Sequence, residues 1–383
     1  MSRAVATAAA LLAAAGLIAG CGTSLEEINR GGRVTGKTLN VYSLLPEAGK
    51  GSGRDIVDAE KLAIYEARGT VGPFAINFLS IDEGAPGGRD GAREAAVELR
   101  DAVADPQVIA LIGPAGSDTA RAAVPLFNAA GILELLPGAG YPGFTDPFKP
   151  GEPDRWQPSG RVTVARVVGE DTQQAEAIAR AAAQATGRRS PRLLVEQEPG
   201  PVADALVEGL RGAGAQLVGD RKRADAFVYS GEDPDNAAAV AYDLAREHPR
   251  TPIVLPDALT RAGVAGRLGR AARRSAVLVS AAPVPGSTEP LRRFEAAFRE
   301  RFGREPGPYA AIGYEAMRSV LAAIAAAGDR GGSRQRVIDA YFEAGERRGT
   351  VLGDYAISPR GQLSPARFTA FRMRDGRAEY LVR

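Results

Sequence analysis

The stretch ALIGPAGSDTARAAVPLFNAAGI, residues 110–132, indicates how this chain folds. An apolar run stops at Gly113-Pro114, and after a Gly-Ser turn the apolar spacing predicts a helix with Ser117 or Asp118 as its cap. The first backbone N–H groups of such a helix have no partner within it, and the helix dipole is positive there. The turn is therefore a candidate site for an anion.

This turn is not a nucleotide-binding loop. It lacks the Gly-Lys-Ser/Thr ending of a P-loop, and no G-x-G-x-x-G opens the helix. On these residues alone, an ordinary strand-to-helix turn with a serine cap is the alternative to a binding site.

The same strand-to-helix order recurs along the chain. Apolar runs such as LNVYSLL, FAINFLSID and TPIVLP alternate with amphipathic stretches such as DIVDAEKLAIYEAR. This alternation predicts an α/β fold with parallel sheets covered by helices on both faces. The Pro- and Gly-rich segment TDPFKPGEPDRWQPSG, residues 145–160, interrupts it and predicts a crossing between two halves, each the size of one doubly wound lobe.

Composition excludes several functional classes. The 383 residues are 45% hydrophobic and 25% charged, which is typical of a soluble globular protein. A formal charge of +2 gives no basic excess for a nucleic-acid partner. One cysteine and one histidine exclude an intramolecular disulfide and a pair of histidine ligands. Without a Gly-x-Ser-x-Gly elbow or a dense carboxylate cluster, we expect no enzyme, metal or cofactor.

The amino terminus carries a targeting pattern. In MSRAVATAAALLAAAGLIAGC, one positive residue precedes an uncharged Ala/Leu run, and small residues stand directly before Cys21, as in a secretory signal. Residues 17–21, LIAGC, resemble the bacterial lipobox, in which the cysteine is lipidated and becomes the first mature residue. A permanent transmembrane helix is the alternative, for which this run is short. Cys21 is therefore expected to be a lipid anchor.

Taken together in their order, several segments resemble the extracytoplasmic solute-binding proteins of type I periplasmic-binding fold that serve branched-chain amino acid and related ABC importers. The segments are LNVYSLLPEAGKGSGRDIVDAEKLAI, IALIGPAGSDTARAAVPLFNAAGI, TDPF with VARVVGEDTQQAEAIA, GYEAMRSVLAAIAAAG and VLGDYAISPRGQ. The resemblance implies two doubly wound lobes that are joined by a multi-strand hinge and close around a small ligand.

The resemblance also implies domain boundaries. The expected parts are a signal peptide (1–20), a flexible tether (21–36), a first lobe (37–155, joined by 284–345) and a second lobe (156–283, with about 346–383 returning to it or to the hinge).

Residues of the ligand site follow from the same resemblance. The positions that match the family's cleft loops are Gly116, Ser117, Asp118, Ala139, Gly140, Tyr141, Glu232 and Asp257. In such proteins the first-lobe turn at Ser117 holds the ligand carboxylate, and an acidic residue at Asp257 receives its ammonium group. Two positions depart from the family: Gly140 replaces a hydroxyl residue and Pro199 replaces an aromatic one. A branched-chain amino acid is therefore not predicted as the ligand.

The function implied is capture of a small polar solute, an amino acid or related compound, by hinge closure. The partners would be an ABC importer permease and, through the lipid anchor, the outer side of the cytoplasmic membrane. We expect a monomer. The alternative is an envelope lipoprotein of the same fold that regulates a sensor or a cell-wall enzyme, and its sign would be a cleft filled by side chains.

Overall fold

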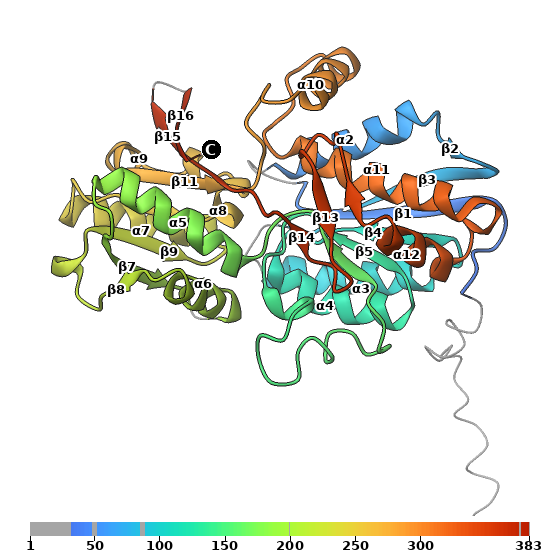
Figure 1. Cartoon of the computed structure of the whole chain (residues 1–383), viewed down its shortest axis with the longest axis horizontal. Helices are drawn as coiled ribbons and strands as arrows, with labels where there is room; N and C mark the ends of the chain where they lie inside the picture. Colours follow the sequence, from blue (N-terminus) through green and yellow to red (C-terminus); the bar gives the residue numbers. More distant parts are fainter. Residues whose placement is uncertain (1–31, 48–51, 85–88, 199, 375–376, 383) are drawn as a thin grey trace, which may run out of the picture.

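The structure, a computed structural model, describes residues 32–47, 52–84, 89–198, 200–374 and 377–382. Two α/β lobes lie side by side (Figure 1), each built on its own sheet. Cys21, Pro199 and the expected signal peptide lie outside the described residues.

The first lobe contains a six-stranded sheet. Its order is β2 (Thr70–Val71), β3 (Phe74–Asp82), β1 (Thr38–Leu45), β4 (Val108–Ile112), β5 (Leu133–Leu136) and β6 (Val164–Arg166). All neighbours pair in parallel except β2 and β3. The helices of this lobe are α2 (Gly53–Glu66), α3 (Arg89–Ala104), α4 (Ser117–Ala129), η1 (Pro142–Phe144), α10 (Glu289–Phe302), α11 (Ala310–Ala327), η4 (Gly328–Arg330) and α12 (Arg334–Glu343). β4 and β5 are buried along their whole length, as expected for strands covered on both faces.

The second lobe contains a seven-stranded sheet. Its order is β16 (Arg377–Val382), β15 (Thr369–Arg374), β11 (Ala276–Ser280), β10 (Ile253–Leu255), β9 (Ala226–Ser230), β7 (Arg192–Gln197) and β8 (Gln216–Leu217). The strands β15 and β16 are antiparallel, and the others pair in parallel. The helices are α5 (Asp171–Thr186), α6 (Pro201–Gly212), η2 (Arg221–Arg223), α7 (Pro234–Glu247), α8 (Asp257–Arg261), η3 (Val264–Gly266) and α9 (Arg270–Ser275).

Three segments cross between the two sheets. They are residues 167–170 after β6, residues 281–288 after β11, and residues 365–368 before β15. A third, small sheet of β12 (Glu346–Arg347), β13 (Tyr355–Ile357) and β14 (Leu363–Ser364) precedes the last crossing. Its residues Tyr355 and Leu363 belong to the first lobe's core, although residues after 346 were expected with the second lobe or the hinge.

The segment 145–160 does not cross between the lobes. It forms a long loop on the side of α4 (Figure 1) and leads into β6, which pairs with β5 in the first sheet. The first sheet therefore extends past the expected boundary at 155. The prolines and glycines belong to a loop of the first lobe, where Trp156 stacks edge-on against Phe144 and Lys149 reaches Asp204 of the second lobe at 2.7 Å.

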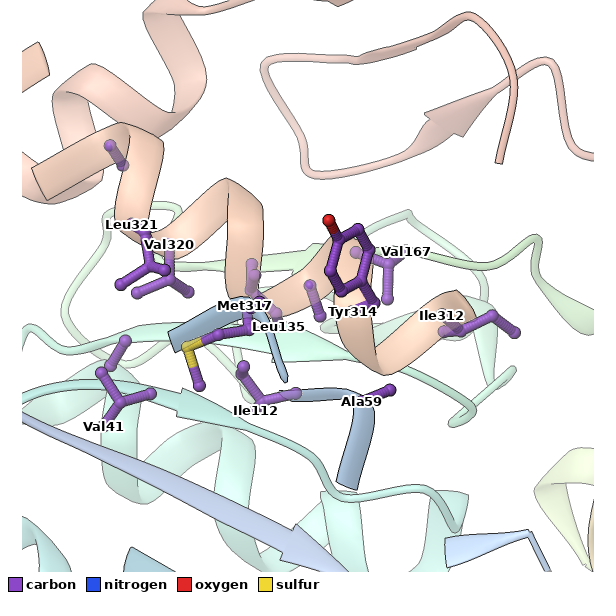
Figure 2. Close-up of a cluster of buried hydrophobic side chains, with 14 of the residues drawn as sticks. Val41, Ala59, Ile112, Leu135, Val167, Ile312, Tyr314, Met317, Val320 and Leu321 are labelled. Atoms are coloured by element: carbon purple, nitrogen blue, oxygen red, sulfur yellow. The ribbon is translucent and has the colours of Figure 1, made fainter. Parts of the chain in front are cut away.

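The core of the first lobe is organised by α11. Met317 and Val320 of this helix are buried on the side that faces the sheet (Figure 2), and Ile324 is buried in the same core. Of the described residues, one stretch, Ala310–Arg330, is long and apolar enough to cross a membrane, but most of it is buried in this core. It therefore acts as a packing helix.

A buried carboxyl group lies in the same lobe. Glu134 of β5 is fully buried, neither of its carboxyl oxygens has a hydrogen-bond partner among the described residues, and burial raises its pKa well above the usual value. Because an unpaired buried polar group is costly, Glu134→Leu should raise the free energy of unfolding by about 1–3 kcal/mol, measured by urea denaturation. Glu346→Leu, at an exposed strand position, is the control and should change it by less than about 0.5 kcal/mol. A less stable Glu134→Leu protein would show that the carboxyl group has an essential partner.

Candidate functional site between the lobes

The turn between β4 and α4 opens toward the second lobe. Gly116 is the N-cap residue, with extended backbone angles and no side-chain cap. The sequence prediction of Ser117 or Asp118 as the cap is therefore wrong: the helix starts at Ser117, and the Ser117 hydroxyl accepts a hydrogen bond from the Tyr141 backbone N–H at 3.3 Å. The backbone N–H groups at this end remain free to bind partners from elsewhere.

Two carboxylates of the chain bind these N–H groups. Glu83, which follows β3, accepts hydrogen bonds from the N–H groups of Ala115 and Gly116, both at 2.9 Å. Glu232, from the loop between β9 and α7 in the second lobe, accepts one from the N–H of Ser117 at 3.1 Å. The anion expected at this turn is thus supplied by the protein, and one of its two sources crosses between the lobes.

The loop of residues 138–141 also contacts the second lobe. Arg261 Nη2 donates to the Gly138 carbonyl at 3.1 Å, and the Asp171 N–H donates to the Gly140 carbonyl at 2.8 Å. A Cβ atom on Gly140 would lie 2.2 Å from Asp171 Oδ1. The glycine found in place of the family's hydroxyl residue therefore makes room for the Asp171 carboxyl group.

Beneath this loop, Arg166 of β6 is fully buried and donates to the carbonyl groups of Ala139 and Tyr141. Its guanidinium group holds the loop in place from the side of the sheet, so its donors are used within the first lobe.

Asp257 begins α8 and is tied to the hinge. Its Oδ1 atom accepts hydrogen bonds from the Ala281 N–H and the Tyr309 hydroxyl, both at 2.6 Å. Its Oδ2 atom lies 3.8 Å from Arg261 Nε in a buried ion pair. One carboxylate oxygen is therefore committed to the crossing segment 281–288 and to Tyr309 of the first lobe's core, and the other faces the Arg261 guanidinium group.

Burial changes the protonation of this site. It raises the pKa of Glu83 to about 7, although the N–H groups of Ala115 and Gly116 favour the charged form. Burial, followed by the nearby charge of Glu232, raises the pKa of Asp171 to about 8, and burial also raises the pKa of Glu232. Several carboxyl groups in one interlobe site therefore titrate above their usual range.

The structure brings some of the predicted site residues together between the lobes and leaves others outside. Gly116, Ser117, Gly140, Glu232 and Asp257 meet between the lobes through the contacts above. The exposed Asp118 side chain instead lies 3.8 Å from Arg121 on α4. Ala139 and Tyr141, in the loop of residues 137–141, contribute mainly backbone, since the Tyr141 hydroxyl points away to Glu152.

Sequence reasoning missed Glu83, Asp171 and Arg261. Each follows a strand: Glu83 comes directly after β3, Asp171 begins α5 after β6, and Arg261 ends the short helix α8 after β10. The carboxyl ends of parallel strands face the crevice of such folds, so position was the available signal.

A separate pocket of about 610 Å³ lies along the three crossings, lined in part by Val168, Ala282 and Phe368. It borders the site described above at Ala281, whose N–H binds Asp257.

No protein-family model matches the sequence, and no curated protein matches it. Solved structures match over nearly the whole chain. An ABC transporter substrate-binding protein from Desulfitobacterium hafniense, in complex with Leu, is 17% identical with a TM-score of 0.70, over 90% of this chain and 99% of that one. The chain has the type I periplasmic-binding fold. The predicted fold class is thereby confirmed.

Other proteins of the type I periplasmic-binding fold match similarly. The leucine-binding protein LivK from Thermotoga maritima is 19% identical with a TM-score of 0.71, over 89% of this chain and 97% of that one. A solute-binding protein from R. palustris, in complex with benzoate, is 18% identical with a TM-score of 0.68, over 90% of this chain and 96% of that one. The ligands bound by these similar proteins thus range from an amino acid to an aromatic carboxylate.

Proposed function

We propose that this protein is an extracytoplasmic solute-binding protein that captures a small polar solute between its lobes and delivers it to an ABC importer. The observation that carries the proposal is the hydrogen bond from the Ser117 N–H to Glu232, which joins polar groups of both lobes at the ends of parallel strands. Closure about the three crossings would bring the same groups onto a ligand without covalent chemistry. Lipidation of Cys21 would hold the protein outside the cytoplasmic membrane.

A second function is favoured by a different observation. The N–H groups of Ala115 and Gly116 are already bound by Glu83 of the same lobe, and Ala205 of α6 packs in one apolar cluster with Val124 and Phe144 of the first lobe. A cleft that closes on its own side chains fits an envelope lipoprotein that keeps the fold and binds a sensor or a cell-wall enzyme.

Thermal unfolding of the purified protein separates the two functions. The melting temperature is followed against amino acids, amides, short carboxylates and polyamines. A ligand at about a hundred times its dissociation constant that binds only the folded state adds roughly 2.7 kcal/mol. A rise with one class supports solute binding. If no class of compound shifts the melting temperature, and native mass spectrometry finds no co-purified ligand, solute binding is rejected in favour of the interaction-protein function.

Replacing Asp257 most directly tests whether the second lobe contributes to ligand binding. For a solute that carries an ammonium group, Asp257→Ala should weaken binding by about 1–3 kcal/mol, the range for hydrogen bonds to charged groups, as measured by calorimetry. Asp243→Ala, at an exposed position of α7, is the control and should bind like the parent protein. Unchanged affinity in Asp257→Ala would remove Asp257 from the ligand site.

A further inference from the structure

Four carboxyl groups from both lobes form what we call the acidic cluster: Glu83, Asp171, Glu232 and Asp257. Glu83 and Glu232 converge on one point, because a Cβ atom on Gly116 would lie 2.9 Å from Glu83 Oε1 and 4.0 Å from Glu232 Oε2. Glu232 and Asp257 are also close enough to Asp171 to raise its pKa. Acidic groups of both lobes therefore meet at the α4 turn.

An anionic ligand has no free donors at the α4 turn. The N–H groups of residues 115–117 already bind Glu83 and Glu232. A ligand carboxylate at this position would have to displace them and would then lie beside two like charges. The turn thus selects against the zwitterion or carboxylate that its backbone alone would attract.

Asp171 provides an unused acceptor in this cluster. Its side chain is buried, with 7% exposed, and its Oδ2 atom accepts no hydrogen bond from the described residues. Its Oδ1 atom has only a long contact, 3.4 Å, with Gln174 Nε2. A buried carboxyl group without a partner is costly, so a donor that reaches Oδ2 would be favoured.

The chain itself places a cation against this cluster. The guanidinium of Arg261 lies between Asp257 and the Gly138 carbonyl, and its Nε atom makes no hydrogen bond. Across the part of the chain that the structure describes, no group of three or more Asp, Glu, His or Cys side chains is placed to hold a metal ion. An organic cation with several N–H donors fits the geometry better than a metal does.

We propose that the interlobe site takes an organic cation, a solute with an ammonium, amidinium or guanidinium group and no carboxylate. This inference rests on the proposed solute-binding function and names its ligand class. The cation would donate to Asp171 Oδ2 and to Glu232, which would hold the second-lobe loop against the α4 turn. Charge-assisted hydrogen bonds of this kind are stronger than neutral ones.

Calorimetric titration of the purified full chain tests the ligand class with four probes: 1,4-diaminobutane, agmatine, L-leucine and benzoate. We expect one of the two cations to bind at one site with at least tenfold higher affinity than leucine or benzoate. Asp171→Asn, which keeps the shape of the side chain, should weaken that binding at least tenfold. Glu83→Gln is a second variant with the same expectation. Glu176→Gln, at an exposed position of α5 that pairs with Arg180, is the matched control.

The outcomes are distinguishable. Tighter binding of leucine or benzoate than of either cation would overturn the ligand class and leave the proposed function standing. Cation binding that both variants retain in full would place the cation outside the acidic cluster and overturn the site. If no probe binds, and no solute in the thermal panel shifts the melting temperature, the proposed function fails and this inference with it.

Discussion

Raising the pH from about 5 to about 8.5 should destabilise the unliganded protein by several kcal/mol. In the unfolded chain, Glu83 and Asp171 lose their protons near pH 4, whereas in the folded protein their pKa values are about 7 and about 8. Between these limits the folded state binds more protons, so its stability falls as the pH rises and levels off above the folded pKa values. Each unit of difference is worth about 1.4 kcal/mol.

The control for this pH dependence removes both carboxyl groups, and the charged and polar groups around them stay in place. Glu83 faces the Ala115 and Gly116 N–H groups, Thr119 and Arg261, and Asp171 faces Glu232, Arg166, Glu170 and Asp257. In the double variant Glu83→Gln, Asp171→Asn, the melting temperature should fall much less over the same pH range. A melting temperature of the parent protein that stays constant or rises from pH 5 to pH 8.5 would contradict the burial of these groups in one closed site.

Replacement of Gly113 by alanine should destabilise the first lobe by at least about 4 kcal/mol, at the upper end of point substitutions. Gly113 follows β4 with a φ of 122°, a conformation that side chains rarely adopt. A Cβ atom there would also lie 2.1 Å from the Leu44 carbonyl oxygen of β1. Because that oxygen belongs to a buried strand, the clash is relieved only by moving the sheet, and the melting temperature should fall by roughly 10 °C.

The variant Gly187→Ala separates the effect of backbone strain from the effect of the collision with Leu44. Gly187 ends α5 with a φ of 67°, and nothing lies within 4 Å of its Cβ position. This variant has the backbone strain without the collision and should lose only about 1–2 kcal/mol. Equal losses in the two variants would mean that the close approach of Gly113 to Leu44 contributes nothing.

Local pattern predicted the elements well. Alternation of apolar runs with amphipathic stretches placed the strands, and the amphipathic stretch DIVDAEKLAIYEAR, residues 55–68, lies almost wholly within α2. The boundary between the lobes was misplaced because the Pro/Gly-rich segment 145–160 has the composition of a linker. The true crossing, VVGE at 167–170, has no such composition, since its residues pack against the hinge.

The chemistry of the site was less accessible from sequence. Ser117 and Glu232 were both expected in the cleft. The hydrogen bond between them was not expected, because 115 residues separate them in the sequence. Glu83 was not singled out, since a lone acidic residue after a strand has no local signature. That Gly140 admits the Asp171 carboxyl group depends on packing between two loops. Such long-range pairings are fixed by the tertiary fold.

Capture of a solute by closure is tested most directly by the distance between the lobes. Spin labels are placed at Asp154 in the first-lobe loop and at Glu208 on α6, both exposed, in the full chain with Cys21 replaced by serine. Pulsed EPR then compares the protein alone with the protein in a saturating mixture of L-leucine, benzoate, 1,4-diaminobutane and agmatine. Capture by closure predicts a shift to one shorter, narrower distance distribution with the mixture. Identical distributions would contradict it and favour a protein whose lobes close on their own side chains.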